Sequence, residues 1–200
     1  MTRDPGRNPL RQNIANAAAR LMAEDGIEDY AQAKRKAARQ VGASDARQMP
    51  TNDEIDAALT LYRSLFQHGH SAQLRELREL ALAVMYELDA FNPHLTGSVL
   101  RGNAGKYADI QLQLFCDNPK SVEHYLLDQG IQFRGAQTRL YAGDMMLPAS
   151  VLVFNRHGYD IYLTLLASRD LRLALKATPA GRPLERAKAE AVEMLIAEDG

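Results

Sequence analysis

The stretch HLTGSVLRGNAGKYADIQLQLF, residues 94–115, contains the pattern that decides the fold. It predicts the end of a strand, a Gly-Ser turn into a short helix, a loop and a second strand. In the second strand Asp109, Gln111 and Gln113 alternate with apolar residues, and side chains two apart on a strand share a face. We therefore expect the apolar set to face a core and the polar set to face water or a ligand.

The Gly-Ser turn has the properties of an anion site. A turn at a helix start exposes backbone N–H groups that no carbonyl satisfies, and these suit phosphate. Arg101 and Lys106 add positive charge nearby. A carboxylate on the following strand can hold Mg²⁺, which takes carboxylate and phosphate oxygens. The residues themselves thus predict a site for a phosphate and a divalent cation.

An ordered set of residues in this stretch also resembles a known sequence signature. The set is Gly97, Ser98, Arg101 and Gly102, followed by the tripeptide Asp109-Ile-Gln111. Over roughly residues 93–166 it resembles the signature of the DNA polymerase beta-like nucleotidyltransferase superfamily. In that superfamily the Gly-Ser turn holds the nucleotide triphosphate, and carboxylates on the strand bind two divalent ions. Gln111 stands where the family has its second carboxylate.

The resemblance implies a role for each of these positions. Asp109 would bind Mg²⁺ or Mn²⁺, and Gln111 would offer a neutral oxygen. A third metal ligand comes from a later strand in the family, and Asp160 is the candidate because it shares a face with Tyr162 in the expected strand 159–166. A strand-edge aspartate beside a turn is the structural alternative for Asp160. The NTP phosphates would be held by Gly97, Ser98 and Gly102, with Arg101 and Lys106 neutralising charge.

Length and composition limit the class of protein. The chain has 200 residues, of which 46% are hydrophobic and 24% charged, with a net charge of −1. These values allow one domain, or one domain with a sizeable appendage. The single cysteine, Cys116, excludes an internal disulfide framework and fits a reducing cytoplasm. No apolar signal core begins the chain, and no window approaches the ~18 apolar residues of a membrane helix, so we expect no membrane association.

The first 92 residues show helical signals. Asn8 and Pro9 mark one helix start, a second helix is expected over 30–41 with Gly42 as its end, and Thr51 with Glu54 forms a capping box. A further helix follows Ser71, and over 71–91 its apolar residues recur every three or four positions. This seam predicts packing on the preceding helix or on the sheet, and a second copy of the chain is the alternative partner.

The second of these helices contains four cations, which are Lys34, Arg35, Lys36 and Arg39. A cluster of this kind suits the phosphates of RNA or DNA, and RNA is therefore a candidate partner. A solvated helix face is the alternative, because no nucleic-acid motif accompanies the cluster.

The rest of the chain alternates strands with one helix. We expect a helix from Asn118-Pro119 to Gly130, short strands over 131–133 and 138–141, a hairpin of 150–154 with 159–166, and a last helix over 184–197. The fold class is therefore α+β, with a nucleotidyltransferase-like mixed sheet, an N-terminal helical region and a C-terminal helix. The expected divisions are 1–92, 93–178 and 179–200.

Three classes of function follow. The leading hypothesis is a Mg²⁺-dependent enzyme that transfers a nucleoside monophosphate from an NTP to an acceptor hydroxyl or phosphate. The second is a module that kept this fold, binds nucleotide or protein, and lost the chemistry. The third is an RNA-binding protein that uses the basic helix. Gln111 separates the first two, because an amide gives a metal site a dipole where a carboxylate gives a full charge.

Overall fold

The computed structural model describes residues 9–24, 27, 29–43, 49–66, 69–105, 108–179 and 181–198. The chain forms two compact units, residues 1–71 and 72–200. The fold class is α+β, as expected, with helices at the N-terminal side, a mixed sheet and a C-terminal helix. Among the described residues, no helix is both long and apolar enough to cross a membrane.

The first unit contains three helices in its described part: α1 (Pro9–Glu24), α2 (Tyr30–Val41) and α3 (Asn52–Phe66). Their small and branched apolar side chains meet in one core, which includes Ile14, Ala18, Ala33, Ala37, Ile55 and Leu59. α2 begins at Asp29, whose side chain accepts the Gln32 N–H, and ends at Gly42 in the left-handed region with φ of 72°. The expected cap Asn8 lies outside the described residues.

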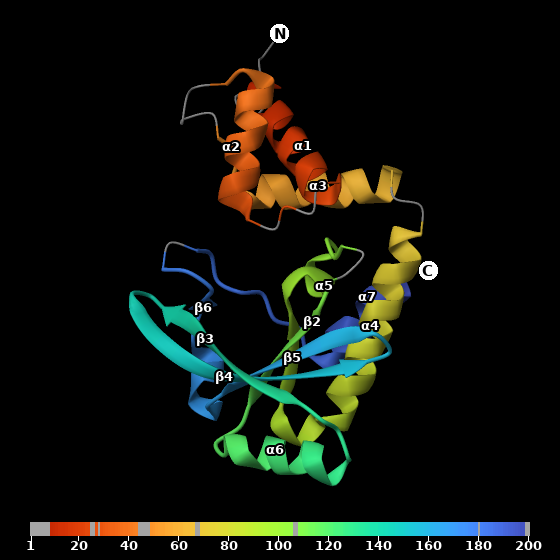
Figure 1. The fold of residues 1–200 in the computed structure, drawn as a ribbon, viewed down its shortest axis with the longest axis vertical. Coiled ribbons are helices and arrows are strands. Elements are labelled where there is room, and N and C mark those ends of the chain that lie inside the picture. Colours follow the sequence, from red (N-terminus) through yellow and green to blue (C-terminus); the bar gives the residue numbers. More distant parts are fainter. Residues whose placement is uncertain are drawn as a thin grey trace. The chain divides into compact units, whose positions relative to one another are not determined.

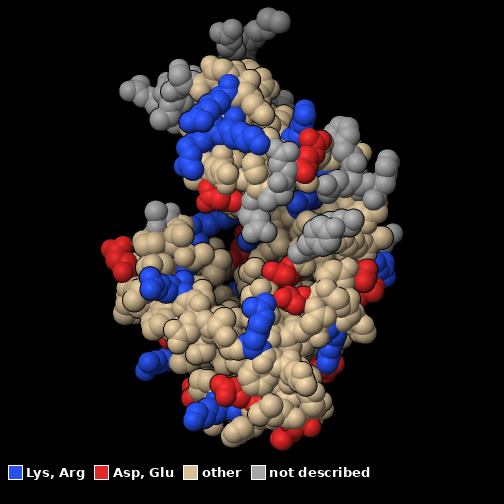
Figure 2. Space-filling view, in the orientation of Figure 1, with Lys and Arg blue, Asp and Glu red and all other residues tan. Residues whose placement is uncertain are grey.

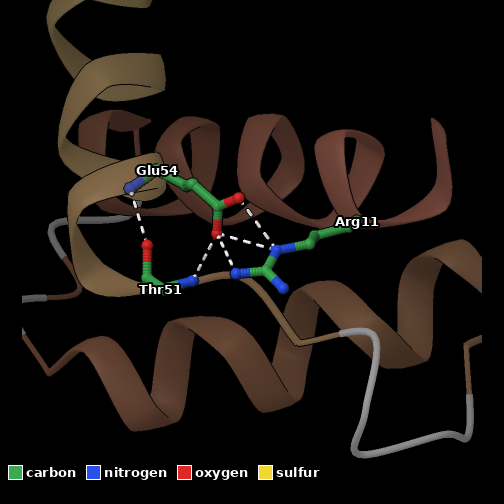
Figure 3. Close-up of polar contacts among 3 residues, drawn as sticks. All are labelled: Arg11, Thr51 and Glu54. Atoms are coloured by element: carbon green, nitrogen blue, oxygen red, sulfur yellow. Dashed lines mark hydrogen bonds and ion pairs between the residues drawn. The ribbon is translucent and has the colours of Figure 1, made fainter. Parts of the chain in front are cut away.

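The capping box at the start of α3 is confirmed. The Glu54 N–H donates to the Thr51 hydroxyl over 3.2 Å, and the Thr51 N–H donates to the Glu54 carboxylate over 2.6 Å. The same carboxylate accepts hydrogen bonds from Arg11 on α1 at 2.8 and 2.9 Å, as Figure 3 shows. A local capping motif therefore also joins two helices that lie 43 residues apart in sequence.

The stability of this unit is expected to fall in acid through Glu54. The Arg11 guanidinium, assisted by Thr51, lowers the pKa of Glu54 from 4.5 to about 2. The folded state therefore favours the ionised carboxylate, and this stabilisation is present above pH 4.5 and lost as the pH falls toward 2. Solvent screening at a side chain that is 40% exposed keeps the effect modest.

Urea unfolding at pH 5 and pH 3, followed by circular dichroism, tests this expectation. Glu54→Gln should lose less stability between the two pH values than wild type does. Glu79→Gln, which removes an exposed carboxylate paired with Arg75, serves as the matched control. Equal pH dependence in wild type and Glu54→Gln would show that this carboxylate is not held by its partners.

The second unit is built on a mixed sheet. Its strand order is β1-β2-β5-β4-β3-β6. β2 and β5 are parallel, and all other neighbours are antiparallel. The strands are β1 (Pro93–Thr96), β2 (Ile110–Phe115), β3 (Arg134–Ala142), β4 (Met145–Arg156), β5 (Tyr159–Leu166) and β6 (Leu175–Lys176).

Helices cover one face of this sheet. They are α4 (His70–Glu87), α5 (Gly97–Arg101), α6 (Pro119–Asp128) and α7 (Ala189–Glu198), with a 3₁₀ turn at Asp89–Phe91. A second 3₁₀ turn, Ser168–Arg172, contributes Leu171 to the opposite face. Figure 1 shows α4 running alongside the sheet with α7 next to it. The seam of α4 packs on the apolar faces of β2 and β5, as one of the expected alternatives stated. The core includes Leu74, Leu77, Val84, Leu88, Leu112, Leu114, Leu163 and Val192.

The opposite face of the sheet is covered over only part of its length. Residues from the segment 171–184 pack on Phe115, Leu140 and Leu166 in a second, smaller core. Toward the starts of β2 and β5, the same face presents the exposed Gln111 and the half-buried Tyr162. Of the polar set predicted from the alternation in β2, Gln111 is thus exposed on a face that the helices leave open, whereas Gln113, expected to face water or a ligand, is buried at 2% exposure.

Several expected boundaries were wrong. Residues 131–133, expected as a short strand, form no strand, and the strand expected over 138–141 is the longer β3, which pairs with β4 from Arg134↔Val153 to Ala142↔Met145. Residue 131 instead closes α6, because the Ile131 N–H donates to the Leu126 carbonyl. β4 is correspondingly longer than expected, and α4 begins at His70 rather than after Ser71.

The C-terminal helix also begins later than expected, at Ala189. Ala187 exchanges two backbone hydrogen bonds with Leu95, so the segment before α7 lies beside β1. An edge strand with unpaired backbone groups competes here with the local helical pattern, and the strand-like pairing prevails.

Candidate functional site

The Gly-Ser turn lies directly against the polar side of β2. Gly97 has φ of 79°, which side chains rarely tolerate, and a Cβ there would be 2.8 Å from the Oε1 atom of Gln111. The positive φ requires glycine at this position, whereas the flexible end of the exposed Gln111 side chain could shift to admit a Cβ. Gly97 is itself buried, and Gln111 is the side chain that packs directly on it.

The two candidate carboxylates belong to neighbouring strands. β2 and β5 pair in parallel with Ile110 opposite Ile161 and Gln111 opposite Tyr162. Asp160 is the second residue of β5, and Asp109 is the residue before β2. Continued by one residue, this register brings Asp109 and Asp160 side by side on the face that includes Gln111.

Asp160 already has two partners on that face. Its Oδ2 atom is 3.1 Å from Nη2 of Arg134, and its Oδ1 atom accepts a 2.9 Å hydrogen bond from Asn155. The Asn155 hydrogen bond, and then that of Arg134, lower the pKa of Asp160. The Arg134 guanidinium also lies 5.9 Å from the centre of the Tyr162 ring. A metal at Asp160 would share the carboxylate with this cation.

Sequence reasoning did not identify Arg134 or Asn155 as parts of the site. For Asn155 a signal was present, because a two-residue hairpin turn at 157–158 places it opposite Asp160. Arg134 had none, since β3 reaches this position only through its pairing with β4.

A buried arginine positions the helix after the Gly-Ser turn. Arg78 on α4 is only 5% exposed, and it donates hydrogen bonds to the carbonyls of Val99 and Leu100, each over 3.2 Å. A third bond, of 3.5 Å, reaches the Leu195 carbonyl on α7. Arg78 therefore supplies hydrogen-bond donors to carbonyls near the end of α5, where a helix leaves such groups without partners of its own. Its position on the apolar stripe of α4, one turn after Leu74, was the available sequence signal.

Other predicted residues of the turn take ordinary structural positions. The Ser98 carbonyl accepts the Gly102 N–H, and Gly102 closes α5 with φ of 76°. Arg101 lies half-buried in the last turn of α5. Lys106 lies outside the described residues. The structure thus brings together the turn and Gln111, and it leaves the contribution of Lys106 as a prediction.

A buried polar cluster lies deeper on the same face. His94 on β1 and Arg186 both contact the Phe115 ring, with centroid distances of 5.2 and 5.3 Å. Burial lowers the pKa of His94, and the positive charge of Arg186 adds to this. Gln113, which pairs with His94 across the strands, is 2% exposed, and its Oε1 atom has no hydrogen-bond partner. His94 and Arg186 therefore pack on the end of β2, the strand that also contains Gln111.

The residues available as metal ligands decide how many divalent ions this site can hold. In the part of the chain that the structure describes, no three His, Cys, Asp or Glu residues gather as a metal site would require. Asp109, Asp160 and the Gln111 amide together offer at most two full negative charges. This set fits one Mg²⁺ or Mn²⁺ that also binds phosphate oxygens, since Mg²⁺ in proteins commonly uses one or two carboxylates plus substrate phosphates. It does not fit two protein-held ions.

Comparisons with models of protein families, with curated proteins and with solved structures give no match for this chain. The nucleotidyltransferase resemblance therefore stays a prediction, and it depends on the residues and geometry given above.

Proposed function

We propose that this chain is a divergent nucleotidyltransferase-like protein that binds an NTP with one divalent ion and transfers the nucleoside monophosphate slowly to an acceptor hydroxyl or phosphate. One observation supports the proposal: Gly97 packs on Gln111 of β2, and β2 pairs in parallel with β5 from Ile110 opposite Ile161, the residues that directly follow Asp109 and Asp160. A phosphate-binding turn and two carboxylates on a single open face are what phosphoryl-type transfer requires of a protein.

Each residue then has a role. The backbone at Gly97, Ser98 and Gly102 holds the phosphates, while Arg101 and Lys106 neutralise their charge. Asp109 and Asp160 hold the cation, which supplies charge neutralisation at the transferred phosphoryl group. Gln111 contributes a neutral oxygen and fills the space beneath Gly97.

A second candidate is a nucleotide-binding module without chemistry. It is favoured by Gln111 in place of a carboxylate and by the engagement of Asp160 with Arg134 and Asn155. Both reduce the negative charge available to a metal. In this case the chain binds NTP but does not transfer the nucleoside monophosphate.

Calorimetric titration of Mn²⁺ in the presence of NTP tests the site. Asp109→Ala should weaken Mn²⁺ binding at least ~10-fold, equal to about 1.4 kcal/mol, because half of the carboxylate charge is lost. Gln111→Asp should tighten it by a similar factor. Asp144→Ala, which removes an exposed carboxylate between β3 and β4, is the matched control and should bind as wild type does.

Pyrophosphate release from the same proteins separates the two candidates. Release by wild type that rises in Gln111→Asp supports the enzyme. Nucleotide binding without release in either protein supports the binding module. If Asp109→Ala leaves both metal and nucleotide binding unchanged, β2 is not part of a metal site and the proposal fails.

A further inference from the structure

One side of α2 forms a stripe of cations and amides. The residues exposed along it are Gln32, Arg35, Lys36, Arg39 and Gln40, here called the α2 basic stripe. Figure 2 shows Lys and Arg gathered over this helix. We propose that the α2 basic stripe binds the phosphate backbone of a nucleic-acid duplex. The proposal concerns the first unit alone and does not depend on the function proposed for the second.

The structure divides the four cations that the sequence grouped together. Lys34 is half-buried, burial lowers its pKa, and the charges of Glu54 and Arg11 act on it. It therefore belongs with the Arg11–Glu54 contact between α1 and α3. The other three cations, Arg35, Lys36 and Arg39, are exposed.

Three acidic side chains in the described part of this unit have partners other than the stripe. Glu24 pairs with Arg20, Asp29 caps α2, and Glu54 pairs with Arg11. Within the described residues neither Arg35 nor Arg39 makes an ion pair, and α2 itself contains no acidic residue. The positive charges of Arg35 and Arg39 are thus not compensated by an ion pair in the described part of the chain.

The spacing of the stripe matches an extended polyanion. From Gln32 to Gln40 the helix rises about 12 Å, at 1.5 Å per residue. A nucleic-acid duplex has about one negative charge per 1.7 Å of its axis, so several phosphates lie within this length. Arg and Lys neutralise phosphates, and Gln amides donate hydrogen bonds to phosphate oxygens.

Two other polyanionic partners fit the stripe less well. A helix that lies on a membrane buries large apolar side chains in the lipid, whereas the only apolar residue exposed on α2 is Ala31. Single-stranded nucleic acid is bound largely by stacking of bases on aromatic rings. The one aromatic residue of α2, Tyr30, is half-buried and donates its hydroxyl to Asp56. Backbone contact with a duplex is the mode that these residues can supply.

Fluorescence anisotropy with the full chain tests the proposal. The probes are a 20-base-pair RNA duplex, the DNA duplex of the same sequence, and the single strands, each at 50 to 200 mM KCl. Wild type should bind a duplex with a slope of log K against log salt near −2.7, about 0.9 for each of three cations. The RNA and DNA arms identify which duplex is preferred, and either preference supports the proposal.

The variant is Arg35→Gln/Lys36→Gln/Arg39→Gln, which keeps good helix formers throughout. It should bind at least ~10-fold more weakly at 50 mM KCl, with a slope near zero. The matched control, Arg20→Gln/Arg75→Gln/Arg169→Gln, removes the same charge from exposed cations outside α2 and should bind within twofold of wild type. Circular dichroism confirms that both variants fold.

Three results would overturn the proposal. The first is unchanged affinity and slope in the α2 variant, and the second is absence of wild-type binding to either duplex at 50 mM KCl. The third is tighter binding to single strands, or to vesicles with 30% phosphatidylserine, than to the duplexes. The Mn²⁺–NTP titration of the α2 variant should match wild type, so a failure here is distinguishable from a failure of the site in the second unit.

Discussion

Leu77→Ala is expected to lower the free energy of unfolding by about 2–5 kcal/mol, the range for a leucine removed from a core. Leu77 is fully buried at 0% exposure, in the seam of α4 that packs on the sheet. The substitution removes apolar contact area and leaves a cavity between the helix and the strands, because neighbouring side chains relax only in part.

Urea unfolding followed by circular dichroism measures this effect. Leu127→Ala on α6 is the matched control, since the same atoms are removed from a side chain that is 61% exposed. Its unfolding midpoint should stay close to that of wild type. If Leu77→Ala and Leu127→Ala unfold at the same midpoint, the seam of α4 is not part of the core.

Arg78→Met is expected to lower the free energy of unfolding by about 2–4 kcal/mol, and to weaken nucleotide binding as well. The guanidinium satisfies carbonyls at the end of α5 and on α7, and without it these buried acceptors lose their partners, each at a cost of about 1–3 kcal/mol. α5 follows Gly97 directly, so a displaced helix changes the turn that is proposed to hold phosphates.

Arg75→Met controls for the loss of an arginine from the same helix. Arg75 is exposed and pairs with Glu79 one turn away, so its loss should cost less than ~0.5 kcal/mol. Arg78→Lys should be intermediate, because an ammonium group cannot reach several carbonyls as the planar guanidinium does. Chemical unfolding and NTP titration at a temperature where all variants are folded give both readouts. Equal stability of Arg78→Met and Arg75→Met would contradict the role of Arg78.

Predictions from the sequence succeeded where a structure depends on a few adjacent residues. The capping box of Thr51 and Glu54, the left-handed stop at Gly42 and the Asn118 cap of α6 all formed as expected. So did the strand, turn, short helix and second strand of residues 93–115. In each case the hydrogen bonds that define the element join residues at most a few positions apart, and residue type alone selects them.

Tertiary structure decided the elements whose partners are distant in sequence. The length of β3 depends on its register with β4, and residues 184–188 lost their helical pattern because Ala187 pairs with Leu95 on the edge of the sheet. A short pattern predicts only that its residues can form a strand or a helix. The hydrogen bonds available from a neighbouring edge decide between the two.

The candidate site divides in the same way. The sequence by itself determined the Gly-Ser turn, the alternation that places Asp109 and Gln111 on one face, and Asp160 as a residue of the later strand. Only the tertiary structure placed Arg78 on the carbonyls of α5, Arg134 on Asp160, and Arg186 on Phe115. These contacts join positions more than 20 residues apart. They depend on which strands and helices pack together, and no local spacing encodes that.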